Sequence, residues 1–131
     1  MTALVRRGLG GRHTYILTVR GRKTGREYST PVVLVEESER FLVSPYGDVG
    51  WVRNARAAGE IELRRARTSE RLRAEELPSD QAAPVLLNYL RRAPVVRPFF
   101  DVTTKSPLAA FEAEAPRHPV FRLTAAPPAA G

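Results

Sequence analysis

A short basic segment, residues 20–26, has the composition of an anion-binding loop. Its sequence is RGRKTGR, and it lies between two apolar, β-branched runs, so we expect it to join two strands of a hairpin. Its two glycines can adopt positive φ, which permits a sharp turn whose concave side exposes backbone N–H groups. The side chains that can add charge or a hydroxyl donor are Arg22, Lys23, Arg26 and Thr24. The segment predicts a site for a phosphorylated or acidic ligand, and a hairpin turn with solvated charges explains the pattern equally well.

A second candidate site is the loop of residues 44–47, which joins an expected strand to a helix expected at residues 49–58. A strand-to-helix turn presents backbone N–H groups and a helix N-terminus to a ligand. Asp48 is expected to cap this helix and Gly59 to end it. The Tyr46 hydroxyl is the best candidate for a proton donor near a reacting oxygen, and packing of its ring on a rim is the alternative.

Hydrophobic periodicity predicts the elements that position these loops. Alternating apolar residues predict strands at residues 15–19, 29–35, 40–44, 60–64, 70–77 and 118–123. Helical spacing predicts the helix at 49–58, with an apolar stripe of Trp51, Val52, Ala55 and Ala58, a second at 78–93, and a short third with Ser106 as its cap. Strands therefore predominate, in a mainly β (α+β) fold.

Two proline-containing stretches limit this assignment. Pro31 should lie near a strand start or a sheet edge, where its missing N–H does no harm. Residues 94–101 should not form regular helix and should leave their aromatic pair exposed or half-buried. Tyr89, Phe99 and Phe100 either roof an apolar substrate pocket or pack in the core.

Length and composition narrow the function classes. The 131 residues are expected to form one domain, with residues 1–12 as a loose basic arm and 124–131 as a disordered tail. The chain has no cysteine, which excludes disulfides, thiolate zinc sites and cysteine nucleophiles. No apolar run approaches the roughly 20 residues of a membrane span, so we expect a soluble, cytoplasmic protein whose basic arm could touch a membrane surface.

The formal charge of +7 favours anionic partners, including acidic cofactors, nucleic acid and anionic lipid. A nucleic-acid module would need basic residues interleaved with exposed aromatics, whereas the aromatics here lie mostly in strand and helix stripes. We therefore expect no nucleic-acid partner. There is no phosphate-binding Walker loop, nucleophile elbow or zinc-protease motif, and His13 and His118 have no supporting metal or triad spacing. Such a chain is a binding module or an enzyme whose cofactor carries the reaction.

Several segments together resemble the deazaflavin-dependent nitroreductase family of actinobacteria. They are GRKTGR at 21–26, TP at 30–31, SPYG at 44–47, WVRN at 51–54, AG at 58–59 and HPVFRL at 118–123. The resemblance extends from about Tyr15 to Leu123. It implies a split β-barrel of about six mostly antiparallel strands with about three flanking helices.

The resemblance also implies a cofactor, coenzyme F420, which is a deazaflavin with a phospholactyl oligoglutamate tail. The implied activity is an F420H2-dependent reductase that passes hydride to a quinone, nitroaromatic or activated alkene, an apolar or aromatic small molecule. The cofactor-site residues that it implies are Arg22, Lys23, Thr24, Arg26, Pro31, Ser44, Pro45, Tyr46, Gly47, Trp51, Arg53 and Asn54. Tyr28 stands where many relatives have an Arg, which removes one expected phosphate contact.

Other functions on the same barrel remain open. A non-catalytic fatty-acid or lipid carrier would keep an apolar cavity but would not need the basic loop. A relative that binds flavin mononucleotide (FMN) or haem is another alternative. The strong positive charge of the chain suits the long acidic tail of F420 better than either of these cofactors. Both a monomer and a homodimer are compatible with the sequence.

Overall fold

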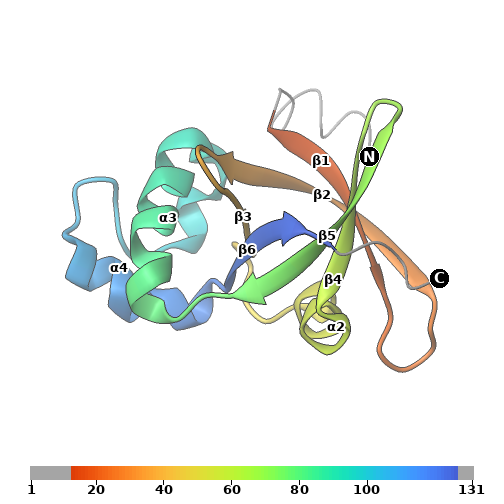
Figure 1. Ribbon diagram of the computed structural model, residues 1–131. Coiled ribbons are helices and arrows are strands. Elements are labelled where there is room, and N and C mark those ends of the chain that lie inside the picture. Colours follow the sequence, from red (N-terminus) through yellow and green to blue (C-terminus); the bar gives the residue numbers. More distant parts are fainter. Residues whose placement is uncertain (1–12, 127–131) are drawn as a thin grey trace.

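The computed structural model describes residues 13–126, in which six antiparallel strands form a closed barrel in the order β1-β2-β3-β6-β5-β4 (Figure 1). The strands are β1 (Thr14–Arg20), β2 (Glu27–Glu36), β3 (Arg40–Val43), β4 (Glu60–Arg65), β5 (Thr68–Glu76) and β6 (Val120–Ala125). The helices are α2 (Gly50–Ala58), α3 (Ser79–Arg92) and α4 (Leu108–Glu114), with 3-10 helices η1 (Pro94–Phe99) and η2 (Ala115–Arg117). The expected split-barrel fold is confirmed.

Strand alternation builds the interior of the barrel, as the sequence predicts. Ile61 and Leu63 of β4 point inward and pair in register with Leu72 and Glu70 of β5, while the charged residues between them face outward. The buried face of α2, with Val52 and Ala55, packs on the same interior cluster. This helix therefore belongs to the barrel core.

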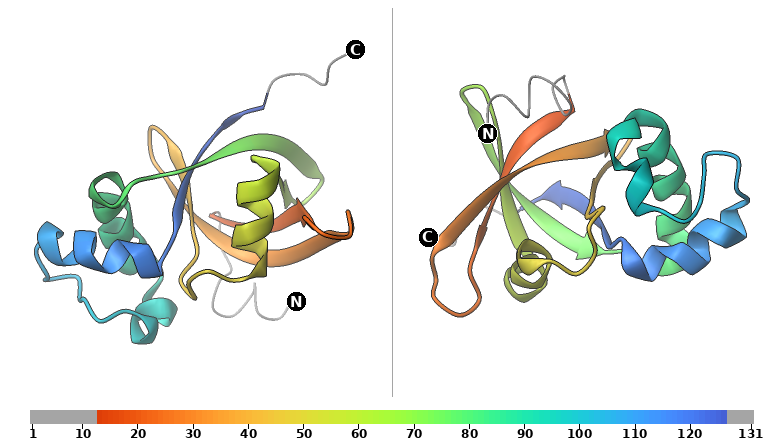
Figure 2. Two further views of the ribbon diagram at one scale, coloured as in Figure 1. Left: turned by 90° about the horizontal axis from the view of Figure 1, so that it is seen from below. Right: turned by 180° about the vertical axis from the view of Figure 1, so that it is seen from behind.

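A second apolar cluster lies outside the barrel. Helix α3 packs its buried side against β2 and β3 and against α4, so α3 and α4 lie together on one side of the barrel, away from α2 (Figures 1 and 2). Leu86 and Leu90 of α3 and Phe111 of α4 are fully buried there. Among residues 13–126, no helix combines the length and the apolar character needed to cross a bilayer.

Strand β2 changes partner along its length. Residues 27–33 pair with β1, and residues 34–36 pair with β3. Within residues 13–126, no other strand pairs with the free edge of the first half. Pro31 lies in that half, opposite Ile16 of β1, at the sheet edge that its missing N–H requires.

The predicted helix starts are wrong in detail. Helix α2 is preceded by Val49 as cap, without a side-chain hydrogen bond, because the Asp48 carboxylate pairs instead with arginines of the helix. Gly59 ends α2 with φ 73°, as expected. In α4 the capping residue is Pro107, and the Ser106 hydroxyl accepts from the Thr103 N–H.

Other differences concern burial and strand length. Ala58 is exposed, whereas Asn54, expected to lie outside the apolar stripe, is buried. Strand β6 extends to Ala125 because β5 is long enough to pair with it, so the expected disordered tail is wrong at residues 124 and 125. Residues 94–99 form a 3-10 helix instead of regular α-helix, as the prolines predict. The basic arm and residues 127–131 lie outside the described residues.

Candidate functional site

The basic hairpin loop and helix α2 together form a pocket of about 320 Å³, called here the cradle pocket. It is lined by Gly21, Arg22, Lys23, Thr24, Tyr28, Gly50, Trp51 and Asn54. The structure thus brings five residues of the predicted cofactor site together: Arg22, Lys23, Thr24, Trp51 and Asn54. Arg26 is exposed and does not line this pocket.

The loop is shaped by backbone hydrogen bonds and by two different glycine requirements. The N–H of Gly21 donates to the Arg26 carbonyl at 2.6 Å, and the N–H of Gly25 donates to the Gly21 carbonyl at 3.0 Å. Gly25 has φ 74°, the left-handed conformation that glycine adopts without strain. Gly21 is needed for a different reason, since a Cβ there would lie 2.7 Å from Cε2 of Tyr28. The expected positive φ therefore occurs at only one of the two glycines.

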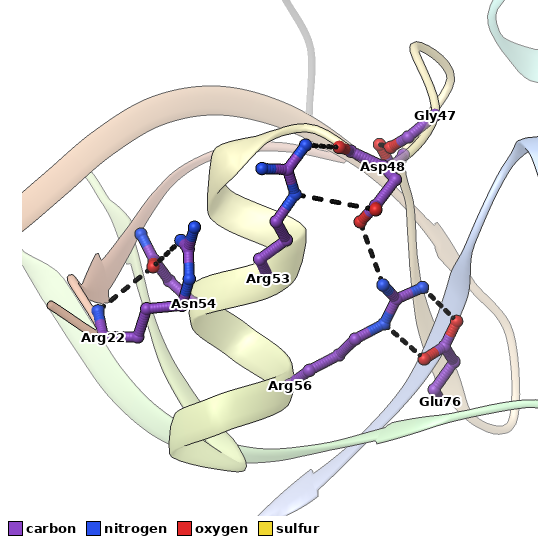
Figure 3. Close-up of polar contacts among 8 residues, drawn as sticks. Arg22, Gly47, Asp48, Arg53, Asn54, Arg56 and Glu76 are labelled. Carbon is purple, nitrogen blue, oxygen red and sulfur yellow. Dashed lines mark hydrogen bonds and ion pairs between the residues drawn. The ribbon is translucent and has the colours of Figure 1, made fainter.

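Helix α2 holds the loop through one buried amide. Asn54 is 6% exposed, and its Oδ1 accepts hydrogen bonds from the Arg22 backbone N–H at 3.1 Å and from the Arg22 guanidinium at 2.8 Å (Figure 3). Asn54 therefore fixes both the main chain and the side chain of Arg22. The sequence did not predict that Asn54 is buried. Its burial follows from the contact with the loop, which is distant in the sequence.

Lys23 is the charged residue of the cradle that is most open to a ligand. It is exposed and has no ion-pair partner among residues 13–126. The Thr24 hydroxyl accepts from the Arg26 N–H at 3.2 Å and keeps its own proton to donate. An ammonium group, the free N–H groups of a guanidinium and a hydroxyl form a donor set that suits phosphate or carboxylate oxygens.

A second pocket of about 330 Å³, called here the apolar pocket, adjoins the cradle pocket at Trp51, which lines both. Its wall consists of Thr30, Pro31, Val32, Val33, Val43, Pro45, Tyr46, Val49, Trp51, Tyr89 and Val96. Within residues 13–126, no charged side chain lines it. Pro31, Pro45 and Tyr46 of the predicted site lie here, next to the free edge of β2.

Two tyrosines contribute to this pocket in different ways. Tyr46 is 59% exposed, and its ring meets the exposed Phe99 edge-on, with ring centroids 4.8 Å apart. Tyr89 is 3% exposed, and burial, with a smaller effect of the nearby Tyr46, raises the pKa of its hydroxyl. Of the expected aromatic roof, only Tyr89 lines the pocket, since Phe100 is buried and stacks on His118 with centroids 3.7 Å apart.

Ser44 and Gly47, both predicted to contact the cofactor, line neither pocket and instead shape their loop. The buried Ser44 hydroxyl donates to the Gly47 carbonyl at 2.6 Å, and Gly47 has φ 90°. The loop is also held from outside, because Nδ1 of His118 lies 2.9 Å from the Pro45 carbonyl oxygen. These two contacts together hold the backbone of the loop of residues 44–47.

The start of α2 is fixed by an ion-pair network that includes the last predicted site residue, Arg53. The Arg53 guanidinium donates to the Asp48 carbonyl at 3.0 Å and lies 3.5 Å from its carboxylate (Figure 3). Arg56 pairs with the same carboxylate at 2.9 Å and with both carboxylate oxygens of Glu76 in β5, at 2.7 and 2.8 Å. Arg53 therefore lines neither pocket and instead braces the loop between β3 and α2.

A buried pair of side chains supports the loop from α4, and no sequence signal beyond an i, i+4 spacing pointed to it. Nε2 of His118 lies 2.7 Å from Oε2 of Glu114, and both residues are buried. The Arg117 guanidinium and the Asp101 N–H also donate to the Glu114 carboxylate. Burial raises the pKa of Glu114, but these hydrogen bonds outweigh it and bring the pKa below its usual value.

Comparison with solved structures shows the same fold at low sequence identity. A protein of unknown function from Agrobacterium tumefaciens has 19% identity and a TM-score of 0.63 over 94% of this chain and 52% of that chain. This chain thus spans about half the length of that protein. An F420-H2 dependent reductase has 18% identity and a TM-score of 0.57 over 86% of this chain and 95% of that chain. The haem storage protein HutZ from Vibrio cholerae has 13% identity and a TM-score of 0.61 over 95% of this chain and 89% of that chain.

Two of these neighbours are named for different cofactors, and all three are less than 25% identical to this chain, so they establish the fold alone. No protein of curated function matches the sequence. The sequence model of a family described as F420H(2)-dependent quinone reductase, however, matches residues 2–111, which include both candidate loops and the whole wall of each pocket. The chain therefore belongs to the F420H(2)-dependent quinone reductase family.

Proposed function

We propose that this protein is an F420-dependent reductase that uses F420H2 to reduce a neutral, largely apolar acceptor of the quinone, nitroaromatic or activated-alkene class. The observation that supports the proposal most directly is the junction of two unlike pockets at Trp51. One is cationic, and the described residues that line the other carry no charge. A cofactor with an anionic tail and a flat ring requires this pair of environments side by side.

The cradle pocket fits the anionic part of the cofactor. Lys23 supplies an unpaired ammonium, Thr24 a hydroxyl, and Arg22 the N–H groups that Asn54 leaves free. Tyr28 lines this pocket at the position where many relatives have an Arg. An aromatic ring would therefore contact the cofactor where those relatives have a charged side chain. Arg26 and Arg53 lie outside the pocket walls and would act on the tail only through their longer-range field.

The apolar pocket fits flat rings. When bound, reduced F420 supplies the hydride. The protein's part is to hold both rings in contact, to exclude water with the valines and prolines of the wall, and to supply a proton at the substrate oxygen. Tyr46 stays the proposed proton donor, because its hydroxyl is at the pocket rim where water can reprotonate it.

Fluorescence titration tests this proposal. The protein would be titrated with F420 and, separately, with FMN, following both the cofactor and Trp51, which is the only tryptophan of the chain and lines both pockets. Micromolar or tighter F420 binding that weakens with added salt, and no comparable FMN binding, is expected. Preference for FMN would reassign the cofactor, and binding of neither, together with co-purified lipid, would favour the carrier function.

A further inference from the structure

Tyr89 is only 3% exposed, and its hydroxyl has no hydrogen-bond partner among residues 13–126. The oxygen is not sealed off by protein atoms, and the residue lines the apolar pocket. Most buried polar groups in folded proteins are hydrogen-bonded, because an unpaired one keeps its full desolvation penalty. The protein therefore leaves this hydroxyl free to bond to an acceptor that enters the pocket.

The ring that carries this hydroxyl is held in place from several sides. Tyr89 packs on Phe100, with centroids 6.4 Å apart, and Phe100 stacks on His118. Helix α3 itself is anchored by fully buried Leu86 and Leu90. The hydroxyl position is thus set by the core before any ligand arrives, unlike that of the exposed Tyr46. Its raised pKa, caused mainly by burial, keeps it protonated and able to donate.

The wall of the apolar pocket restricts the chemistry of the ligand. Among the described residues that line it, the side-chain polar groups are the Thr30 and Tyr46 hydroxyls, the Trp51 ring N–H and the Tyr89 hydroxyl, and none of these residues carries a charge. A charged group placed in it would lose hydration without compensation. Its volume of about 330 Å³ is at the small end of ligand pockets, which suits compact, flat rings.

From this geometry we propose that Tyr89 donates a hydrogen bond to a carbonyl oxygen of a flat, neutral ring bound in the apolar pocket. The proposal rests on the proposed function for the source of that ring, which is either the quinone-type substrate or the deazaflavin ring, since both carry carbonyl oxygens. Tyr89 is thereby a specificity-determining residue, which selects rings that place a hydrogen-bond acceptor next to its hydroxyl.

The test uses Tyr89→Phe, which removes the hydroxyl and keeps the ring. Binding of menadione, a compact quinone, and of methylnaphthalene, which lacks the carbonyls, would be measured by Trp51 fluorescence without cofactor. F420 would be titrated in parallel. We expect three- to tenfold weaker binding of the carbonyl compound that uses the hydroxyl, and unchanged binding of methylnaphthalene. The matched control is Tyr15→Phe. It also removes a tyrosine hydroxyl, but this hydroxyl donates to Glu36, and neither residue lines a pocket.

The two arms identify the source of the carbonyl. Weaker binding of menadione alone assigns the substrate, and weaker binding of F420 alone assigns the cofactor ring. Unchanged affinity for both overturns the proposal. The thermal midpoint of Tyr89→Phe should stay equal to that of the unmodified chain or rise, and a clear fall would show an internal partner instead. If the unmodified chain does not bind F420, the proposed function fails, while the menadione arm still decides the role of Tyr89.

Discussion

Asn54 and Arg22 are joined by two hydrogen bonds to a single oxygen, since Oδ1 of Asn54 accepts from both the backbone and the side chain of Arg22. The contact links helix α2 to a loop 32 residues earlier in the chain. It fixes the direction of one guanidinium before an anion binds, which lowers the ordering cost of binding.

Asn54→Ala should therefore weaken F420 binding about tenfold and lower the free energy of unfolding by about 1 to 2 kcal/mol. The released Arg22 can rehydrate, because it is exposed, which limits the loss of stability. Cofactor titration and urea unfolding measure the two effects. Loss of stability with unchanged affinity would restrict Asn54 to a structural role.

Lys23 and Arg26 provide a comparison at constant net charge, because they lie in the same loop but only Lys23 lines the cradle pocket. Lys23→Ala is expected to weaken F420 binding about tenfold, or about 1.4 kcal/mol, and Arg26→Ala less than about threefold. Titration of both variants at low and moderate salt is the measurement. Equal losses would mean that the overall field attracts the cofactor without a defined cradle.

Gly21 and Gly25 should respond to substitution for different reasons. Gly21→Ala places a methyl group 2.7 Å from the Tyr28 ring and 3.1 Å from the Arg26 carbonyl, so the loop must shift at a cost of about 1 to 3 kcal/mol. Adding Tyr28→Ser should recover part of that loss. Gly25→Ala meets no atom within 4 Å but is strained at φ 74°, which costs about 1 kcal/mol. Urea unfolding of these three variants, with Tyr28→Ser alone as a reference, separates the two causes, and no recovery in the double variant would exclude the clash with the Tyr28 ring.

Glu114 should make stability fall in acid. Its pKa is below the usual value in the folded protein, so the unfolded chain binds more protons as the pH falls. The stabilisation is complete above the unfolded pKa of about 4.3 and is lost as the pH falls through the folded pKa. Glu114→Gln should be less stable near neutral pH and show a shallower loss below about pH 5. Urea midpoints across this range check it, and parallel curves for the two proteins would contradict it.

The barrel was predictable because its strands are short runs of apolar and β-branched residues, and β4 and β5 alternate apolar with charged residues. Leu72 and Ala74 of β5 illustrate this, since both are buried while their neighbours face outward. The basic loop was predictable for a related reason, because a hairpin turn depends on glycines close in sequence. The ends of elements were less predictable, since they depend on which distant group competes for a polar side chain.

Asp48 shows that competition. A residue of its type before a helix favours a cap, but Arg56, held by Glu76 of β5, binds its carboxylate instead. Asn54 and Tyr89 show the same limit at the site, because an amide on a polar helix face and a tyrosine in an apolar stripe gain their roles only from segments far away in the chain. The predicted proton donor Tyr46 lies at the pocket, and its chemical role stays a prediction.

The shared position of Trp51 has a thermodynamic consequence. One indole ring forms part of the wall of both the cradle pocket and the apolar pocket, so a change in its rotamer alters the shape of both at once. We therefore expect ligands in the two pockets to influence each other's affinity, and by the same factor in each direction. With the occupants proposed above, Trp51 would couple the binding of the cofactor to that of the acceptor.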